Sequence, residues 1–393
     1  MKRLKVTRLG ILLMAASTAC FGKDRPLVGA IRWDAWTGGN VTKQVERTLE
    51  PQQYHNRLPW FARVLDDGTV KIDGSPQGVM DKEIVFATSA GIDYWAFLIY
   101  PQDSSMTTAL EQYFRSPKRT QVQFCMILHN TFGAQPDVWP KERDRAVALL
   151  SEPGYQKVLG YRPLVYLFGA AIITSGRFEE WLAAARKKGH NPYCVFMGRN
   201  PPADYKKAKP KGFDAVSAYA CGSAQPKFAQ LVKTVESNYW ERAAKAKVPY
   251  IPLVSTGWNK EPRKDNPVSW EKNRPYHKQK VFTSVAKPRE IANHLKKAFA
   301  FVHKHPDLCE ANAVIVYAWN EYDEGGWLAP TRGSNLHKPN RMLFIVGGWL
   351  APTRGSNGKP DNGRLDAIRK ALKRENVTQQ SPADDSLKAA PEE

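Results

Sequence analysis

Closely spaced cysteine pairs are absent from this chain of 393 residues. Its five cysteines stand at positions 20, 125, 194, 221 and 309, so no two are separated by only a few residues. Because a structural zinc site needs such ligand pairs, no zinc knuckle, metal site or cofactor is expected. Cys125 and Cys194 lie within apolar runs and are expected to be buried thiols. One disulfide remains open, and the spacing does not say which cysteines would form it.

Long apolar runs are also scarce. The chain begins with the basic segment Met1–Arg8, which is followed by the apolar run Leu9–Ala16 and by small residues up to Cys20. The run is too short to span a bilayer, and this order is typical of a secretory signal. We therefore expect a signal peptide over residues 1–22 and an exported protein, either periplasmic, on the cell surface or secreted. A lipid anchor at Cys20 stays open, since Ser17 stands where lipoprotein signals usually carry Leu.

Acidic residues are outnumbered, because 38 Asp and Glu face 58 Lys and Arg and give a formal charge of +20. Four basic residues lie in the expected signal, which leaves +16 for the mature chain. A basic surface favours polyanionic partners. No nucleic-acid-binding module is recognisable and export argues against nucleic acid, so an anionic or sulfated glycan is the expected partner. A basic surface without a specific partner is the alternative.

Apolar strand-like runs alternate with amphipathic segments along most of the chain. Strands are expected over residues 27–36, 92–101, 122–130, 162–169, 192–198, 213–220, 250–258 and 314–317. Helices are expected over 107–114, 141–150, 178–188, 227–245, 288–303 and 363–374, and a long polar segment follows the first strand. Eight such βα units indicate a (β/α)8 TIM barrel. We expect one catalytic domain over residues 23–374 and a disordered polar tail over 375–393.

One segment is duplicated. The eleven residues Gly325–Asn335 recur identically at Gly347–Asn357, and no longer period is present. A solenoid is therefore excluded. The duplication over residues 325–357 is interpreted as a local event in the loop after the eighth strand.

Two glutamates follow the eighth strand. Glu321 and Glu324 are three residues apart, and Gly325–Gly326 ends the element. A tight turn would bring both carboxyl groups into one pocket, at the strand ends where TIM barrels carry their active sites. Two carboxyl groups beside aromatic rings suit glycoside chemistry, in which one donates a proton and the other attacks or abstracts. A solvated acidic loop is the alternative.

Aromatic and polar residues collect in and near the other expected strands. Sugar rings could stack on the tryptophans, and the polar side chains could bind hydroxyl groups. The candidate substrate-binding residues are Trp33, Asp34, Trp36, Asp93, Trp95, Tyr100, His129, Asn130, Tyr166, Trp258, Asn259, Arg263, Trp319, Asn320 and Trp327.

The segment Trp319–Gly325 reads Trp-Asn-Glu-Tyr-Asp-Glu-Gly. It resembles the Trp-Asn-Glu-Trp-x-Glu-Gly signature of glycoside hydrolase family 99 and its WbsX-type relatives. Gly91–Phe97, Ser255–Asn259 with Arg263, and Trp33–Trp36 resemble other strand motifs of that group. Tyr322 replaces the usual Trp, and Gly326–Leu328 differs from the substrate-contacting residues of the mannosidases.

This resemblance implies a (β/α)8 barrel and a retaining α-mannosidase-type hydrolase. It implies that Glu321 acts on the sugar 2-hydroxyl through a 1,2-anhydro sugar, and that Glu324 is the general acid/base. In that role Glu324 is expected to have a raised pKa. Two alternatives stay open, a glycosyltransferase of the WbsX type and a non-catalytic glycan-binding lipoprotein.

Overall fold

The computed structural model describes residues 25–130, 132, 136–169, 171–222, 225–332 and 360–378. The expected signal with Cys20 lies outside the described residues, as do the second copy of the duplicated segment and residues 379–393. The first copy is described as far as Arg332.

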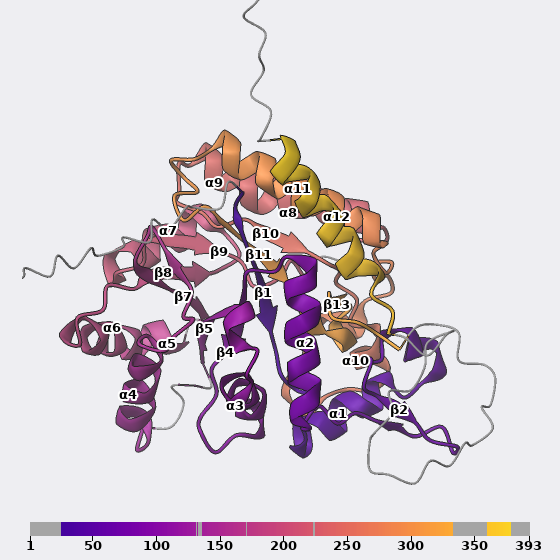
Figure 1. Cartoon of the computed structure of the whole chain (residues 1–393). Helices are drawn as coiled ribbons and strands as arrows, with labels where there is room; N and C mark the ends of the chain where they lie inside the picture. Colours follow the sequence, from indigo (N-terminus) through magenta and orange to yellow (C-terminus); the bar gives the residue numbers. More distant parts are fainter. Residues whose placement is uncertain are drawn as a thin grey trace, which may run out of the picture.

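Eight parallel strands form the centre of the molecule (Figure 1). They lie in the order β10-β11-β1-β4-β5-β7-β8-β9. Because neighbouring strands are parallel, the chain must cross over between one strand and the next along the sequence. Their bounds are β1 Leu27–Arg32, β4 Tyr94–Leu98, β5 Gln123–His129, β7 Arg162–Phe168, β8 Tyr193–Met197, β9 Ala215–Ser217, β10 Leu253–Ser255 and β11 Ala313–Tyr317. All eight strands predicted from the sequence are confirmed. The prediction succeeds because a parallel strand is buried on both faces and so appears in the sequence as an apolar run.

The two edges of this sheet meet. A parallel bridge joins Val216 of β9 to Tyr250, three residues before β10. The amide of Val216 donates to the carbonyl of Pro249 over 3.0 Å, and the amide of Ile251 donates to the carbonyl of Val216 over 3.1 Å. The fold is a nearly closed (β/α)8 barrel, as the strand and helix alternation predicts.

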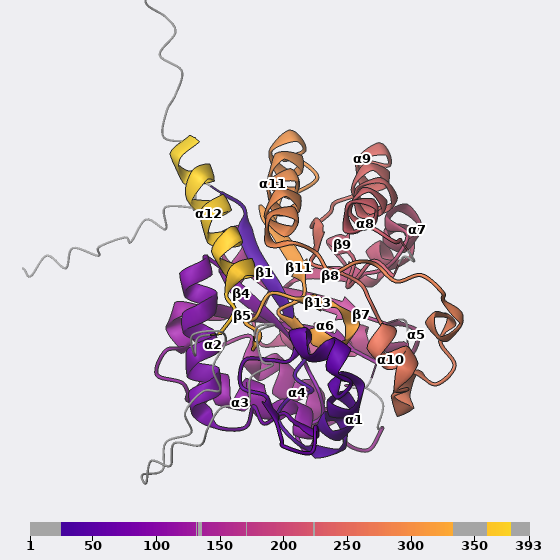
Figure 2. The same ribbon diagram turned by 90° about the vertical axis from the view of Figure 1, so that its right-hand side faces the viewer.

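Helices surround the barrel, with α12 packed between α2 and α11 (Figure 2). Short antiparallel pairs lie outside the barrel, namely β2 (Arg63–Val64) with β3 (Val70–Lys71), and β6 (Lys157–Val158) against β7. The helices are α1 Gly39–Leu49, α2 Gln77–Ala90, α3 Thr108–Arg115, α4 Trp139–Leu149, α5 Ala171–Thr174, α6 Arg177–Lys187, α7 Pro201–Ala208, α8 Phe228–Val235, α9 Arg242–Lys245, α10 Glu261–Asp265, α11 Pro288–Lys304 and α12 Gly363–Thr378.

Several helical features differ from the sequence-based expectation, which did not include α5, α7 or α10. The polar segment after β1 contains α1 and α2, which the sequence analysis did not predict. In α1 only Val41, Val45 and Leu49 mark the inward face, and polar residues such as Thr48 are buried beside them. The helix expected over 227–245 is interrupted by a π-helical stretch, η5 (Glu236–Glu241), and α12 continues to Thr378 rather than ending at residue 374.

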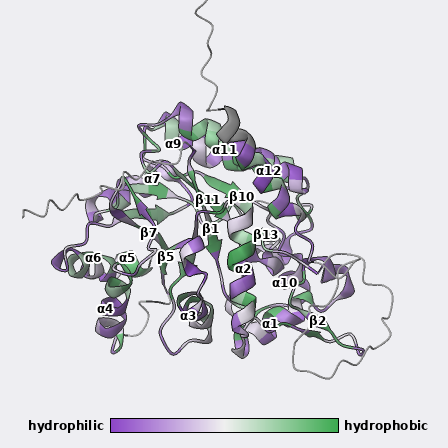
Figure 3. Cartoon of the chain, viewed as in Figure 1, coloured by the Kyte–Doolittle hydropathy of each residue, from purple (hydrophilic) through white to green (hydrophobic). Residues whose placement is uncertain are grey.

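Hydrophobic residues concentrate on the strands, whereas the helices carry both hydrophobic and hydrophilic residues (Figure 3). Cys125 and Cys194 are buried, as predicted, and all four cysteines in the described part of the chain are free thiols. Among the described residues, no helix is long and apolar enough to cross a membrane.

Candidate active site

The chain turns sharply after β11. The strand β12 (Asn320–Glu321) pairs antiparallel with β13 (Gly326–Trp327), and the short 3-10 helix η8 (Tyr322–Glu324) joins them. Gly325 ends this helix with φ +81°, and a Cβ there would lie 2.7 Å from the backbone nitrogen of Asn259. Glycine is therefore required by both conformation and space. The turn buries Glu321 and Glu324 together at the carboxyl end of the barrel, where their exposures are 2% and 7%.

Glu321 is the more enclosed of the two. Its Oε1 accepts a hydrogen bond of 2.6 Å from the hydroxyl of Tyr219, which follows β9. Its Oε2 is buried and has no hydrogen-bond partner within the part of the chain that the structure describes. Burial, followed by the nearby charge of Glu324, raises the pKa of Glu321 well above its usual range. The sequence analysis did not predict this shift at Glu321.

Glu324 lies among cations. Its Oε1 contacts Lys260 Nζ at 2.9 Å and also Arg263 Nη1. Its Oε2 accepts a hydrogen bond of 2.7 Å from the hydroxyl of Tyr317, the last residue of β11. Both carboxylate oxygens of Glu324 therefore have partners, whereas Oε2 of Glu321 has none among the described residues.

Arg263 holds the acidic residues of this turn in place. It donates to both carboxylate oxygens of Asp323, from Nε over 2.6 Å and from Nη2 over 3.1 Å. Its Nη1 also contacts Glu271 Oε2 at 3.0 Å. Burial opposes ionisation of Glu271, but Arg263 and Lys260 outweigh it and lower the pKa of Glu271 to about 2. With its donors occupied and its side chain 1% exposed, Arg263 positions the glutamates rather than binding substrate directly.

Residues after β1 form one wall of the site. The backbone amide of Trp33 donates to Asn320 Oδ1 over 2.9 Å, and Asn320 Nδ2 donates to Asp34 Oδ1 over 3.0 Å. Asp34 is fixed in turn by Arg32, whose Nη2 lies 2.7 Å away. The Trp33 ring nitrogen donates to the hydroxyl of Tyr100 over 2.9 Å. These contacts bring four of the predicted residues, Trp33, Asp34, Tyr100 and Asn320, into one network.

His129 extends this wall. Its ring lies 4.5 Å from that of Tyr100, and its Nε2 is buried without a hydrogen-bond partner among the described residues. Burial lowers the pKa of His129 to about 4, so the ring is neutral at pH 7. A neutral imidazole can donate or accept one hydrogen bond to a sugar hydroxyl.

Trp258 and Trp36 lie at other points around the glutamates. The Trp258 ring lies 5.7 Å from the ring of Tyr317, and Lys260 Nζ lies 4.8 Å from the Trp258 ring centroid. Trp36 packs edge-on against Trp33 at 6.3 Å and against Tyr322 at 5.1 Å. Because Trp36 is 2% exposed, it packs behind Trp33 and is not available to a substrate.

Several predicted residues lie elsewhere. Asp93 precedes β4 and pairs with Arg25 at 2.7 Å, at the amino end of the barrel. Trp95 and Trp319 are fully buried and pack on each other at 5.2 Å. Tyr166 lies inside the barrel, where its hydroxyl is 2.8 Å from that of Tyr94. The side chains of these four predicted residues therefore stabilise the fold and do not lie beside the two glutamates at the carboxyl end of the barrel.

Three further predicted residues have local structural contacts. Asn130 Oδ1 accepts a hydrogen bond of 3.0 Å from the amide of Ala171. Asn259 Nδ2 donates to the carbonyl of Thr283 over 2.9 Å. The guanidinium of Arg364, from α12, lies 3.7 Å from the ring centroid of Trp327. Trp327 thus faces α12 rather than the two glutamates.

The structure adds residues that the sequence analysis missed. Tyr219, Tyr317 and Lys260 contact the two glutamates directly. Tyr219 directly follows the β9 region, so the rule that places sites at strand ends could have identified it. Tyr317 was missed because it was interpreted only as part of the buried run that it ends, and Lys260 because it lies five residues after the end of β10. Among the described residues, no group of three or more His, Cys, Asp or Glu could hold a metal ion.

Comparison with solved structures places this fold beside known enzymes. The family 99 endo-α-mannosidase from Bacteroides thetaiotaomicron, in complex with bis-tris propane, is similar with a TM-score of 0.52 and 12% identity, covering 90% of this chain and 98% of the other. A second structure of the endo-α-mannosidase from that organism is similar with a TM-score of 0.51, at the same identity and coverage. At this identity the likeness shows a glycoside-hydrolase-like barrel fold and nothing finer.

The sequence itself matches a known family. No curated protein matches the chain. Residues 126–337, more than half of the chain, match the family described as "Glycosyltransferase WbsX". This stretch contains Tyr219, Arg263, Glu321 and Glu324, the centre of the site described above. The chain therefore belongs to the WbsX family.

Proposed function

We propose that this protein is an exported, retaining glycoside hydrolase whose Glu321 and Glu324 act together on a glycan. The observation that carries the proposal is that one short turn buries both carboxyl groups at the carboxyl end of the barrel. Their environments differ. Glu321 accepts a hydrogen bond from Tyr219 through one oxygen, and its other oxygen has no partner among the described residues, whereas Glu324 contacts the two cations Lys260 and Arg263. A buried pair of carboxyl groups, of which Glu321 has a raised pKa, is typical of acid/base catalysis.

Each glutamate is assigned a role by the resemblance to family 99. Glu321 takes the proton of the sugar 2-hydroxyl, so that the oxygen attacks the anomeric carbon and gives a 1,2-anhydro sugar. The raised pKa supports this role, because a carboxylate with a higher pKa is the stronger base once it is ionised. Glu324 protonates the leaving oxygen and then activates the water that opens the anhydro ring.

The opposite assignment has one observation in its favour. Lys260 and Arg263 contact Glu324, and this suits an anion, whereas the enclosed Glu321 suits a group that holds a proton. In that case Glu321 would be the acid. The two assignments predict different responses to the leaving group, which the Discussion uses as a test.

Release of reducing ends from a panel of α-mannans, sulfated glycans and polyuronates tests the proposal. The wild-type chain should release sugar from at least one class, and Glu321→Gln and Glu324→Gln should lose that activity by about 10²-fold or more. The family description supplies a second candidate, a glycosyltransferase. Consumption of a sugar nucleotide without hydrolysis would favour it, and tight glycan binding without either reaction would favour a binding protein.

Export forms part of the proposal and rests on the basic, apolar and small-residue order of residues 1–22. Expression of the full chain in a bacterial host tests it. We expect a shortened mature protein outside the cytoplasm. A Cys20→Ser variant that shifts the protein from the membrane fraction to the soluble exported fraction would identify Cys20 as a lipid anchor.

A further inference from the structure

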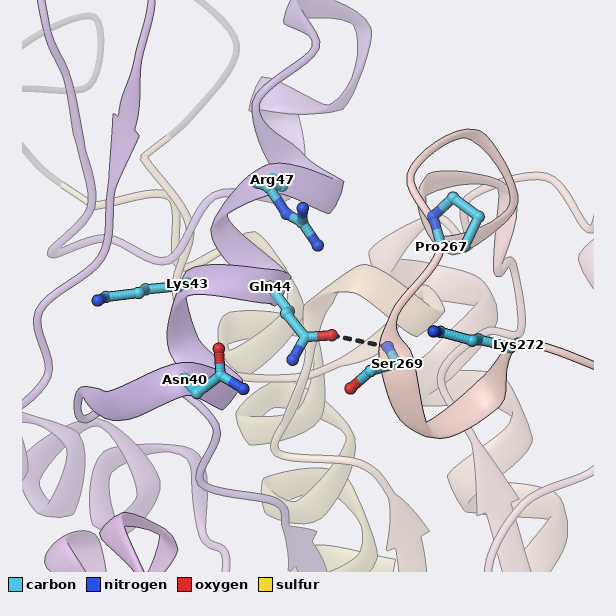
Figure 4. A pocket seen from close by; sticks show the side chains of 7 residues that line it. All are labelled: Asn40, Lys43, Gln44, Arg47, Pro267, Ser269 and Lys272. Carbon is cyan, nitrogen blue, oxygen red and sulfur yellow. Dashed lines mark hydrogen bonds between the residues drawn. The ribbon is translucent and has the colours of Figure 1, made fainter.

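A basic hollow of about 480 Å³ lies between α1 and the loop that carries η6 (Ser269–Glu271) (Figure 4). Its volume is within the range of ligand pockets, about 300–1,000 Å³. The backbone amide of Ser269 donates to Gln44 Oε1 over 2.7 Å and joins the two sides. The residues that line this hollow, apart from a proline, are Asn40, Lys43, Gln44, Arg47, Ser269 and Lys272.

The lining carries positive charge and no carboxylate. Arg47 from α1 and Lys272 from the loop extend toward the Gln44–Ser269 bond from two sides, while Lys43 extends along the other side of α1 (Figure 4). Within the described part of the chain, none of these three cations forms a salt bridge. Among the acidic residues nearest in sequence, Glu46 and Glu50 accept hydrogen bonds from the backbone amides of Ile72 and Val70. Glu271 is occupied by Lys260, Arg263 and Tyr276. The charge of the hollow is therefore available to a ligand.

Three consecutive residues connect the hollow to the glutamates. Ser269 lines the hollow, and Trp270 is 37% exposed with its ring 6.0 Å from that of Trp33. Glu271 contacts Arg263, the residue that holds Glu324. The helix α1 also packs against both α10 and η8, so the hollow borders the turn that carries the glutamates.

We propose that the basic hollow is an oxyanion subsite for the glycan. It binds a sulfate ester or a uronate carboxylate through Arg47 and Lys272, with the Asn40 and Gln44 amides as further donors. The adjoining sugar stacks on the exposed face of Trp270, and the chain continues past Trp33 toward Glu321 and Glu324. This inference rests on the proposed function, since it requires a glycan at the carboxyl end of the barrel, and it gives the expected anionic glycan a defined binding site.

Charge at a defined place distinguishes this proposal from a generally basic surface. A diffuse positive field attracts any polyanion regardless of which exposed cations are removed. A subsite loses affinity only when its own cations are removed. The chain offers a matched control in Arg186 and Lys207, which are exposed and lie in the last turns of α6 and α7, at the opposite end of the barrel.

Binding of three probes by isothermal titration calorimetry tests the subsite. The probes are a mannan, the same mannan after chemical sulfation, and a polygalacturonate. All measurements use the full chain with Glu324→Gln, which prevents turnover. This reference is compared with a subsite variant that also carries Arg47→Gln and Lys272→Gln, and with a control variant that also carries Arg186→Gln and Lys207→Gln. Removing two exposed charge contacts, each of modest strength, should lower the affinity for the anionic glycan about five-fold.

We expect the Arg47→Gln, Lys272→Gln pair to weaken binding of an anionic glycan about five-fold and to leave mannan unaffected. The control pair should change neither. The anionic probe that shows the loss identifies the oxyanion as sulfate or carboxylate. Equal losses in both pairs, no loss in the first pair, or tightest binding of plain mannan would overturn the subsite. Reducing-end release by the unaltered chain is measured separately, so an absence of hydrolysis would overturn only the proposed reaction.

Discussion

The hydroxyl of Tyr219 donates a hydrogen bond to Oε1 of Glu321 over 2.6 Å, although the two residues are 102 positions apart. One follows β9 and the other follows β11, so the bond reaches across the end of β10. Tyr219 is stacked on Phe168 at 4.4 Å, which fixes its ring. The hydrogen bond favours the charged form of Glu321 against the burial that raises its pKa. Tyr219 is thus a positioning residue that also adjusts the basicity of Glu321.

Replacing Tyr219 by Phe removes this hydrogen bond and little else. Without it the pKa of Glu321 rises further, so a larger fraction is protonated at a given pH. If Glu321 is the base, kcat should fall about ten-fold at neutral pH, and the acidic limb of the pH–rate profile should move to higher pH. Tyr193→Phe is the matched control, because Tyr193 donates to Glu310 over 3.0 Å and begins β8, at the other end of the barrel. An unmoved acidic limb in Tyr219→Phe would contradict this role.

Leaving-group dependence assigns the two glutamates. If Glu324 is the acid, Glu324→Gln should lose about 10²–10⁴-fold on a natural glycan and much less on an activated aryl glycoside, which needs little protonation. Glu321→Gln should then be damaging on both substrates. The reverse pattern would make Glu321 the acid. Losses of only a few-fold for both variants, each first shown to be folded by thermal unfolding, would place the chemistry elsewhere.

Arg263 is expected to be essential for stability. Arg263→Leu leaves Asp323, Glu324 and Glu271 close together without their shared cation. Breaking a buried ion-pair network from one side costs about 3–5 kcal/mol, which denaturant unfolding would measure. Arg115→Leu is the control, because Arg115 is exposed and lies 3.9 Å from Glu111 in a surface pair worth at most about 1 kcal/mol. Similar losses in the two variants would show that the network is not the source of stability.

Two buried histidines predict acid sensitivity. Burial lowers the pKa of both His129 and His294 to about 4, whereas an unfolded histidine titrates near 6.5. Between these values the unfolded state binds more protons, so stability is complete above pH 6.5 and is lost as pH falls toward 4. Linkage gives about 3 kcal/mol for each histidine over this window.

His294→Gln tests this dependence, since it can keep the contact with the carbonyl of Ser255 but cannot titrate. We expect the variant to lose clearly less free energy of unfolding than the wild type between pH 7 and pH 4.5. His303→Gln, at an exposed position of α11, should behave as the wild type. An unchanged pH dependence in His294→Gln would show that another group controls acid unfolding.

The barrel was predictable because a strand buried on both faces appears in the sequence as a continuous apolar run. Val314–Tyr317 is such a run, and it is fully buried in β11. A continuous apolar run, however, does not show which side chains point into the barrel and which point toward the helices. Trp95 stands among apolar neighbours on both sides, so its sequence could not show that it packs on Trp319 in the core. Helix α1 was missed because its apolar positions are sparse.

The glutamates were predictable because they follow a strand, but their environment was not. Arg263 lies 60 positions before Asp323, and only the folded barrel brings their side chains together. Asp93 illustrates the converse, since it precedes its strand and so lies at the end of the barrel away from the mouth. Tyr219 was within reach of the same strand-end reasoning. Its partner, however, depends on where the turn after β11 places Glu321.

The single bridge between Val216 and Tyr250 gives the barrel a seam. The strands on either side, β9 and β10, have three residues each, so few amides lock this edge. Amide hydrogen exchange should therefore be fastest along this line within the sheet. Tyr219 leaves the seam on one side and Trp258 on the other. Opening of the seam would therefore move Tyr219, the hydrogen-bond partner of Glu321, relative to the Trp258 ring.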